Sequence, residues 1–548
     1  AAFVADATTG PSLATLVTPV SVALPPAVNN QSQIQLRIMT TNAVGNDEWV
    51  GIDNISITST AIPSGPVFNG AVNVGTGEAI TSLTNAGGLF EQMNSGTLSG
   101  DVIVNLTSDL SGETGTHALN QLTETGSGGY TVFVRASGAA RSIEGSSALG
   151  LIRLNGADRV TFSGLALGPY GISVRNTGTG PVFRLENDAS GNAIRSCSVE
   201  GGNADVNSGV ILIGDGAALG SGNDNNSISD SRVRDRSDAA GVPANLIRVA
   251  GLDGLARNTG TAISNNLLFD YTSTAILIGF ADDTSITGNT IFQASPRVTV
   301  SAISLLSSSG TNTVGQNIIR DHTVTSGFVG INMQDAAGTT TISRNRVFEI
   351  EHSGAGGGVL QGIHLVGDNA AATVDASNNM LSIAPASATS AVIFGIQDAR
   401  LQGSGSFVHN SIHVGGTSSG ADSHAFLRGI GSISSILLTD NILFNSRTGG
   451  NSFAVGDQSS RAGSWSSDSN LFVGTGTTPS NFFDFGGAAV DFAAWKASPP
   501  AQDASSIASV ANVGPFNVGN IFASASDLHL RTIGNNPAIN AAGASGVT

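Results

Sequence analysis

A short pattern of apolar and polar positions recurs along the second half of the chain. It consists of an aliphatic residue, two small or polar residues, an asparagine, any residue and a second aliphatic residue, as in ITGNTI, which ends at Ile291. We call the asparagine position the Asn slot. It is filled by Asn266, Asn289, Asn317, Asn345, Asn379, Asn410, Asn441 and Asn470. Eight aligned asparagines indicate a structural repeat rather than an Asn-rich composition.

The spacing of the repeat predicts its architecture. Upstream, the slot is assigned to Leu165, Cys197 and Ser231, which makes about eleven recognisable coils. Separations range from 23 to 35 residues, with a mean of 30.5 over the ten intervals between residues 165 and 470. Helical repeats keep a nearly constant length, whereas a parallel β-helix needs register only in its strands and lets its loops vary. Each coil also holds a second apolar run, such as VILI at 210–213. We therefore expect an all-β protein with a right-handed, three-sided parallel β-helix.

Asparagine in the slot suits a corner between two sheets. It tolerates the left-handed backbone conformation that a sharp bend requires. In coils stacked at ~4.8 Å, identical Asn side chains can hydrogen-bond along the column and satisfy buried amide groups. The pattern predicts a structural Asn ladder, in which Cys197 is a small buried filler.

Periodicity divides the chain into four regions. These are a partial β-sandwich at 1–60, a linker at 61–77, a capping helix region at 78–100 and the β-helix at 101–548.

Both ends of the predicted solenoid carry candidate capping elements. In SLTNAGGLFEQMNS (82–95), one helical face holds Leu83, Ala86, Phe90 and Met93, and this helix is expected to cover the N-terminal mouth. At the other end, 490–498 is expected to form a short helix and 527–540 a last coil.

Two segments resemble known families. Residues 27–57, AVNNQSQIQLRIMTTNAVGNDEWVGIDNISI, look like the last two strands of a concanavalin- or laminin-G-like jelly roll of secreted bacterial proteins. Residues 78–545, and the run 118–165 in particular, resemble pectin-lyase-like β-helices of bacterial cell-surface and secreted proteins. That superfamily contains lyases, hydrolases, phage tailspikes and non-catalytic adhesins, so the resemblance does not select a function.

Composition narrows the choice of partners and compartment. Lys and Arg number 23 against 40 Asp and Glu, for a net charge of −17, and no basic face is evident, which argues against a nucleic-acid partner. No run of 18 apolar residues is present, so we expect no membrane-spanning segment. The sequence begins at Ala1 without a signal-like segment and is therefore interpreted as a mature or excised piece of an extracellular or cell-surface protein.

Acidic residues recur four positions past the Asn slot. Consecutive coils carry Asp235, Asp270, Gln293, Asp321 and Glu349 there. Stacked carboxylates could share a Ca²⁺, bind a polysaccharide or act in acid–base chemistry, or could be solvated turn residues. Near this column lie Asp230, Arg234, Arg320, His322, Arg344, Glu351 and His352.

Two further groups are candidates for binding. In the jelly-roll fragment, Asp47, Glu48 and Asp53 could hold Ca²⁺, which is the candidate cofactor of this chain. Three positions past the slot, Phe269, Phe292, Phe348 and Phe444 could form an outward aromatic stripe that packs on a neighbouring chain or a sugar, unless they are buried under loops.

No complete catalytic set is found. Asp282-Asp283 resembles the paired aspartates of pectin-degrading hydrolases, but the companion NTD, GHG and RIK motifs are missing, and no zinc motif occurs. We therefore favour a non-catalytic extracellular structural or adhesive protein, as a subunit of a filament or surface layer, with other copies or surface proteins as partners. The alternative is a polysaccharide lyase or hydrolase, or a glycan-binding β-helix.

Overall fold

The computed structural model describes residues 65–531 apart from 166–167, 215–221, 239–240, 253–255, 476–481 and 512–515, together with residues 536 and 538 and seven isolated positions before residue 57. The chain separates into two units, Ala1–Ile62 and Pro63–Thr548. The predicted jelly-roll fragment belongs to the first unit, and its Asp47, Glu48 and Asp53 lie outside the described residues.

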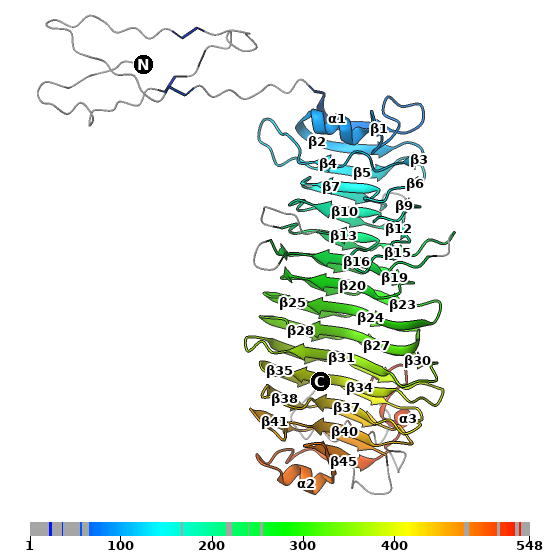
Figure 1. Cartoon of the computed structure of the whole chain (residues 1–548), viewed down its shortest axis with the longest axis vertical. Helices are drawn as coiled ribbons and strands as arrows, with labels where there is room; N and C mark the ends of the chain where they lie inside the picture. Colours follow the sequence, from blue (N-terminus) through cyan, green and yellow to red (C-terminus); the bar gives the residue numbers. More distant parts are fainter. Residues whose placement is uncertain are drawn as a thin grey trace, which may run out of the picture. The chain divides into compact units, whose positions relative to one another are not determined.

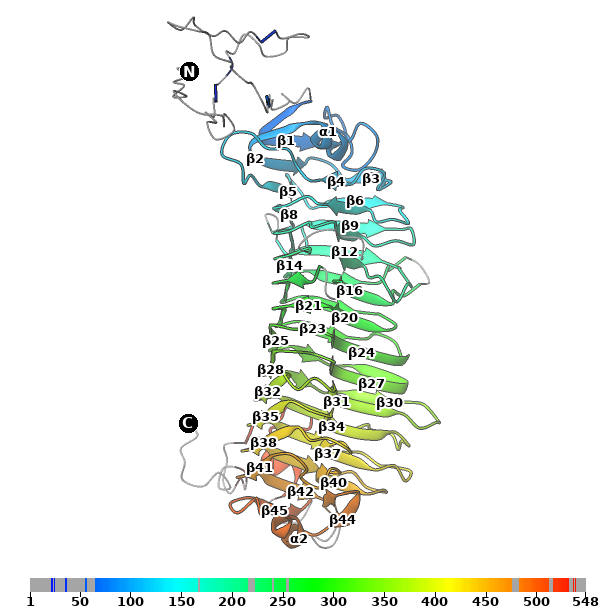
Figure 2. The same ribbon diagram turned by 60° about the vertical axis from the view of Figure 1, so that its left-hand side comes forward.

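The second unit is a parallel β-solenoid of about 13 stacked coils, which confirms the predicted fold class (Figures 1 and 2). Each regular coil contributes one strand to each of three sheets, here named A, B and C. Sheet A contains β1 (Val67–Val74), β2 (Thr97–Leu106), β5 (Val132–Ala136), β8 (Val160–Ser163), β11 (Ala193–Arg195), β14 (Ser227–Ser229), β18 (Ala262–Ser264), β22 (Ser285–Thr287), β25 (Thr311–Gly315), β28 (Thr339–Ser343), β32 (Thr373–Ser377), β35 (Ser404–Val408), β38 (Ser435–Thr439) and β41 (Trp465–Asp468). Sheet B contains β3 (Leu110–Glu113), β6 (Arg141–Gly145), β9 (Ile172–Asn176), β12 (Cys197–Gly201), β15 (Arg232–Arg234), β19 (Leu267–Phe269), β23 (Thr290–Phe292), β26 (Ile318–Ile319), β29 (Arg346–Val347), β33 (Met380–Ile383), β36 (Ser411–Val414), β39 (Ile442–Asn445), β42 (Leu471–Gly474) and β45 (Ile507–Val510).

The third sheet contains the longest strand of the solenoid's described part, with 13 residues. Sheet C contains β4 (Leu119–Asn120), β7 (Ile152–Asn155), β10 (Phe183–Glu186), β13 (Ile211–Ile213), β16 (Asn245–Ala250), β20 (Thr274–Gly279), β24 (Arg297–Leu306), β27 (His322–Gln334), β31 (Val359–Gly367), β34 (Val392–Arg400), β37 (Ser423–Arg428), β40 (Ser452–Asp457), β43 (Phe483–Phe485) and β44 (Ala488–Val490), with β30 (Ile350–His352) paired to β27. All pairs in these sheets are parallel except β43 with β44. A separate two-stranded sheet joins β17 (Asn258–Thr259) and β21 (Ala281–Asp282).

The alternation of inward-pointing and outward-pointing side chains along each strand builds the core. On sheet A, Ile263, Ile286, Val314 and Ile342 pair in register on consecutive coils, and each is buried. Because successive side chains of a strand point to opposite faces, one apolar residue per strand pointing inward gives a continuous column. Stacking these columns from three sheets removes apolar surface from water along the whole solenoid, which is its main stabilising term.

The left-handed corner residue directly precedes the Asn slot and does not occupy it. Asn265, Gln316 and Arg344 have φ of 56°, 58° and 58°, and the same conformation recurs before the later Asn residues. The expectation that the slot asparagine itself adopts this conformation was therefore wrong. The slot assignment of Leu165 was also wrong, because Ile172 is the residue that pairs with Cys197.

Three helices accompany the strands in the described part. Helix α1 (Leu89–Ser95) lies at the N-terminal end of the solenoid and buries Leu89, Phe90 and Met93 (Figure 1). It begins later than expected, so Ala86 is exposed. Helix α2 (Phe492–Ala497) matches the helix expected at 490–498, and Asp491 caps it by accepting a hydrogen bond from the Ala494 N–H at 2.7 Å.

The described residues 518–531 of the C-terminal segment do not add a coil to the three sheets. Helix α3 (Val518–Ile521), Phe522 and Leu528 pack on the outer face of sheet B, where Ile521, Phe522 and Leu528 form an apolar cluster. Their partners on the sheet include Phe444, whose ring centroid lies 6.3 Å from that of Phe522. Phe444 is therefore covered by the chain itself and is not part of an exposed stripe.

We predict that two buried histidines make the fold less stable in acid. Burial lowers the pKa of His322 to about 3 and that of His413 to about 4, and His322 also hydrogen-bonds to the Tyr271 hydroxyl at 2.8 Å. In the unfolded chain both imidazoles have the ordinary histidine pKa of about 6.5. Unfolding then takes up protons at lower pH, so each histidine should remove about 3 kcal/mol of stability between pH 6.5 and pH 4.

Thermal unfolding followed by circular dichroism from pH 7 to pH 4 measures this effect. His413→Gln should flatten the fall in Tm, whereas His529→Gln, at an exposed side chain, should leave its slope unchanged. An identical slope in the wild type and in His413→Gln would contradict the assignment.

In the described part of the chain, none of the helices has the length and apolar character needed to cross a membrane.

Candidate functional site

The eight slot asparagines form a hydrogen-bonded column between sheets A and B. Each Nδ2 donates to the Oδ1 of the next Asn at 3.0 Å, from Asn266 through Asn470. Each Oδ1 also accepts the main-chain N–H of the preceding slot, at 3.0 Å between Asn266 and Asn289. The column continues into Ser506, whose Oγ accepts from the Asn470 N–H at 2.9 Å. These amides are buried and bonded to one another, so they serve the fold and leave no group to a ligand.

The acidic residues past the slot stack in register, but they do not gather into one site. The pairing of Arg234 with Phe269 places Asp235 beside Asp270 on the next coil. Asp235 forms an ion pair with Arg234 at 2.9 Å, and Asp270 accepts from the Ala294 N–H at 2.9 Å. Burial raises the pKa of Asp235, and the nearby Asp270 carboxylate adds to this.

The other half of the column is arranged differently. Asp321 forms an ion pair with Arg320, and Glu349 is exposed. Across the described residues, no group of three or more His, Cys, Asp or Glu side chains is close enough together to hold a metal ion. Calcium binding by Asp235, Asp270, Asp321 and Glu349 therefore stays a prediction without a described cluster to support it.

Histidines near the column in sequence do not face it. His322 and His352 are buried, and His352 Nδ1 lies 2.7 Å from the Thr389 hydroxyl. Asp282 and Asp283 also have separate partners: Asp282 pairs with Arg257 at 2.7 Å, and Asp283 accepts from the Thr311 N–H at 2.7 Å. These contacts give each group a role in joining coils.

Arginine and phenylalanine side chains build a continuous stack on the outer face of sheet B. The rings of Phe269 and Phe292 are parallel within 11°, with centroids 4.7 Å apart. The Arg234 guanidinium lies 4.7 Å from the Phe269 ring, and that of Arg320 lies 5.1 Å from the Phe292 ring. We call these four residues the Arg–Phe stack. Each is half-buried, so the stack contributes to the described surface.

Two more arginines extend this surface. Arg232 donates to the Ser198 hydroxyl at 3.0 Å and lies over the Tyr170 ring. Arg346 lies 5.1 Å from the Phe348 ring. Neither forms an ion pair with a carboxylate of the described residues. The sequence pattern indicated a phenylalanine stripe and placed Arg234 and Arg320 near the acidic column, but it did not indicate that these arginines stack on the rings.

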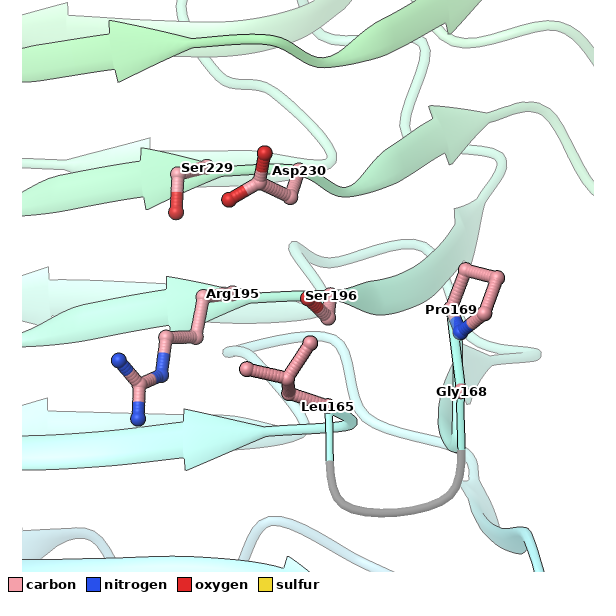
Figure 3. A pocket seen from close by; sticks show the side chains of 7 residues that line it. All are labelled: Leu165, Gly168, Pro169, Arg195, Ser196, Ser229 and Asp230. Carbon is pink, nitrogen blue, oxygen red and sulfur yellow. The ribbon is translucent and has the colours of Figure 1, made fainter.

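A pocket of about 490 Å³ opens near the corner between sheets A and B (Figure 3). It is lined by Leu165, Arg195 and Asp230, together with small residues of the same coils. Arg195 donates from Nε to the Ser163 hydroxyl at 3.1 Å and forms no ion pair with Asp230. With one carboxylate and an exposed leucine, the pocket offers too few converging polar groups to define a ligand.

Comparisons with known proteins show similarity of fold alone. No family model matches the sequence, and no curated protein matches it. The solved structures similar to the chain include the surface adhesin PfbA of Streptococcus pneumoniae, at 9% identity and a TM-score of 0.34, covering 65% of this chain and 78% of that one. Another is the A-module of the mannuronan C-5 epimerase AlgE6 of Azotobacter vinelandii, at 11% identity and a TM-score of 0.32, covering 70% and 91%. A third is the tailspike protein gp49 of the Acinetobacter baumannii bacteriophage Fri1, a capsular polysaccharide depolymerase, at 10% identity and a TM-score of 0.26, covering 78% and 64%.

Proposed function

We propose that this chain is a non-catalytic extracellular surface protein that binds a polysaccharide along the outer face of sheet B. The observation that carries the proposal is the Arg–Phe stack, in which four planar groups follow one another on consecutive coils.

The chemistry of the stack favours an oxygen-rich ligand. Because the rings and guanidiniums face one another, their edges are what they can present to solvent. An aromatic edge carries partial positive charge, and a guanidinium edge carries N–H donors. Hydroxyl and carboxylate oxygens of a polysaccharide are the matching acceptors for the N–H groups that Asp235 and Asp321 do not occupy, and the neighbouring Arg232 and Arg346, which form no ion pair in the described residues, favour acidic sugars.

The geometry of the stack favours a polymer. Its members repeat along the solenoid axis at the ~4.8 Å spacing of paired strands. A chain of sugar units lying parallel to the axis can contact several coils at once, and linked weak contacts of this kind add up to useful affinity. A single small molecule would reach only one or two of them.

The neighbouring carboxylates support binding over acid–base chemistry. Asp235 and Asp321 are each paired with an arginine of the Arg–Phe stack, and Asp270 is bonded to a main-chain N–H and lies 3.6 Å from Arg297. A general acid or base must reach the proton that it transfers, and these pairings occupy the groups that could do so.

Affinity measurements with polygalacturonate and with dextran test this proposal. We expect the wild-type protein to prefer the acidic polymer, and the double variant Phe269→Ala/Phe292→Ala to bind it about tenfold more weakly. Phe133→Ala is the matched control, since Phe133 is a half-buried outward ring on sheet A with the Arg195 guanidinium 5.4 Å from its centroid. It should bind as the wild type does.

Arg234→Gln/Arg320→Gln provides a second variant that keeps both rings. Loss of two guanidiniums should weaken binding and reduce its dependence on salt. Equal affinity of all variants for polygalacturonate, or no binding by the wild type to either polymer, would overturn the proposal.

A further inference from the structure

A second polar site, unrelated to the Arg–Phe stack, lies on the outer face of sheet C. Register places Phe394, His424 and Phe453 side by side on β34, β37 and β40. Ring centroids are 5.7 Å apart for Phe394 and His424, and 4.7 Å apart for His424 and Phe453, with interplanar angles of 26° and 28°. The imidazole is thus held between two aromatic rings, and its side chain is 5% exposed.

A glycine lets this imidazole reach an aspartate two strands away. A Cβ on Gly456 would lie 2.8 Å from His424 Cδ2 and 3.1 Å from Nε2, so only glycine leaves room for the ring. Beyond it, His424 Nε2 lies 3.1 Å from Asp484 Oδ2, which also accepts from Gln458 Nε2 at 2.9 Å. Burial raises the pKa of Asp484, but the hydrogen bonds from His424 and Gln458 outweigh this and hold that pKa below its ordinary value.

Two polar atoms of this group have no partner within the described residues. They are His424 Nδ1 and Asp484 Oδ1, both buried. Beside them is a pocket of about 390 Å³, whose lining includes Phe394, Gln397, Asp422, His424, Leu427 and Gln458. Buried polar atoms without partners are costly, and a ligand or water that bonds to them removes that cost.

We propose that this pocket on sheet C binds a single neutral sugar ring. Phe394 and Leu427 provide an apolar wall for the C–H face of a pyranose, and the amides of Gln397 and Gln458 can donate to and accept from its hydroxyls. The Asp422 carboxylate, which accepts from the Asn451 N–H at 3.2 Å, can also accept from a sugar hydroxyl.

Charge selects a neutral ligand over an acidic one. Asp422 lines the pocket, and Asp484, which is bonded to His424, adjoins it; His424 is the only other ionisable residue among the lining residues. A uronic acid would place a third negative charge there and would be repelled. This preference is the opposite of that proposed for the Arg–Phe stack, and the site goes beyond that function because it does not need the stack.

Titration calorimetry and saturation-transfer NMR with a panel of neutral hexoses, and with galacturonic acid, test the pocket. At least one neutral hexose should bind, and galacturonic acid should bind more weakly. Gln397→Ala and Asp422→Asn should each weaken the hexose about tenfold. The matched control is Gln334→Ala, an exposed glutamine on β27 of the same sheet, outside the pocket.

The outcomes of the two proposals can be told apart. Phe269→Ala/Phe292→Ala should keep hexose binding, and Asp422→Asn should keep polygalacturonate binding. If no neutral hexose binds to the wild type, or if Gln334→Ala weakens binding as much as Gln397→Ala, the pocket assignment is overturned whatever the polymer does.

Discussion

Replacing Asn345 by alanine is expected to destabilise the solenoid by about 4 kcal/mol, since it breaks the Asn column in its middle. The lost Oδ1 accepts from both the N–H and the Nδ2 of Asn317, at 3.1 and 3.0 Å. The lost Nδ2 donates to the Val314 carbonyl at 2.8 Å. Alanine would leave these fully buried groups without partners.

Hydrogen exchange at the Asn317 amide, together with urea unfolding, measures this loss. Protection of that amide should fall first, because its acceptor is the removed oxygen. Asn207→Ala, at an exposed side chain, is the control and should change stability by less than about 0.5 kcal/mol.

A serine at the same position offers an internal comparison. Ser231 occupies the slot naturally, and its Oγ accepts from the Cys197 N–H at 3.1 Å. Asn345→Ser should therefore cost less than Asn345→Ala. If both variants unfold at the wild-type urea concentration, the column does not contribute to stability as argued.

The fold could be predicted from the sequence because a solenoid uses the same residue type at the same corner of successive coils. Asparagines at similar intervals were enough to indicate stacked coils. About eleven coils could be recognised individually out of about 13, since the first coils place Arg141 and Ile172 where later ones place asparagine, and these residues carry no recognisable signal.

The sequence repeat could not predict which side chains contact one another across coils. Counting from the slot places Arg320 in the same column as Phe292, but it does not show that the Arg320 side chain contacts both Phe292 and Asp321. A side chain of this length can point along the column or away from it, and only packing decides which. For the same reason, nothing in the repeat indicates that the C-terminal segment covers Phe444.

The pocket on sheet C was missed because its residues differ in type from coil to coil, so no repeated residue marks their column. His424 lies 60 positions before Asp484, and the glycine that allows their contact, Gly456, is one of 71. A glycine in a strand indicates the close approach of another group, but the sequence does not say which group approaches.

Replacing Asp457 by alanine should cost about 3–5 kcal/mol, since it leaves the buried charge of Arg428 without a counter-ion. Arg428 and Asp457 are both fully buried, and they share two hydrogen bonds of 2.8 and 3.0 Å. The Asp457 carboxylate also accepts from the N–H groups of Ser459 and Arg461 at 3.1 and 2.6 Å. Alanine would therefore leave these two main-chain donors without an acceptor as well.

A surface pair with the same two-point geometry is the control for this prediction. Arg236 and Asp238 share two hydrogen bonds of 3.1 Å, but the Asp238 side chain is 42% exposed. Asp238→Ala should destabilise the protein far less than Asp457→Ala, because the Asp238 carboxylate is exposed and Arg236 keeps its hydrogen bond to the Thr177 carbonyl.

The double variant Arg428→Met/Asp457→Leu separates two causes of the loss. If an unpaired buried charge is responsible, removing both partners should recover much of the stability lost in Asp457→Ala. Arg428 Nη1, however, also donates to the carbonyls of Ser434 and Ala462, at 3.1 and 2.8 Å, and these would lose a donor in the double variant. Recovery should therefore be partial when urea midpoints of the three proteins are compared. A double variant as unstable as Asp457→Ala would show that Arg428 acts mainly by bonding the backbone of neighbouring coils, and not through its ion pair.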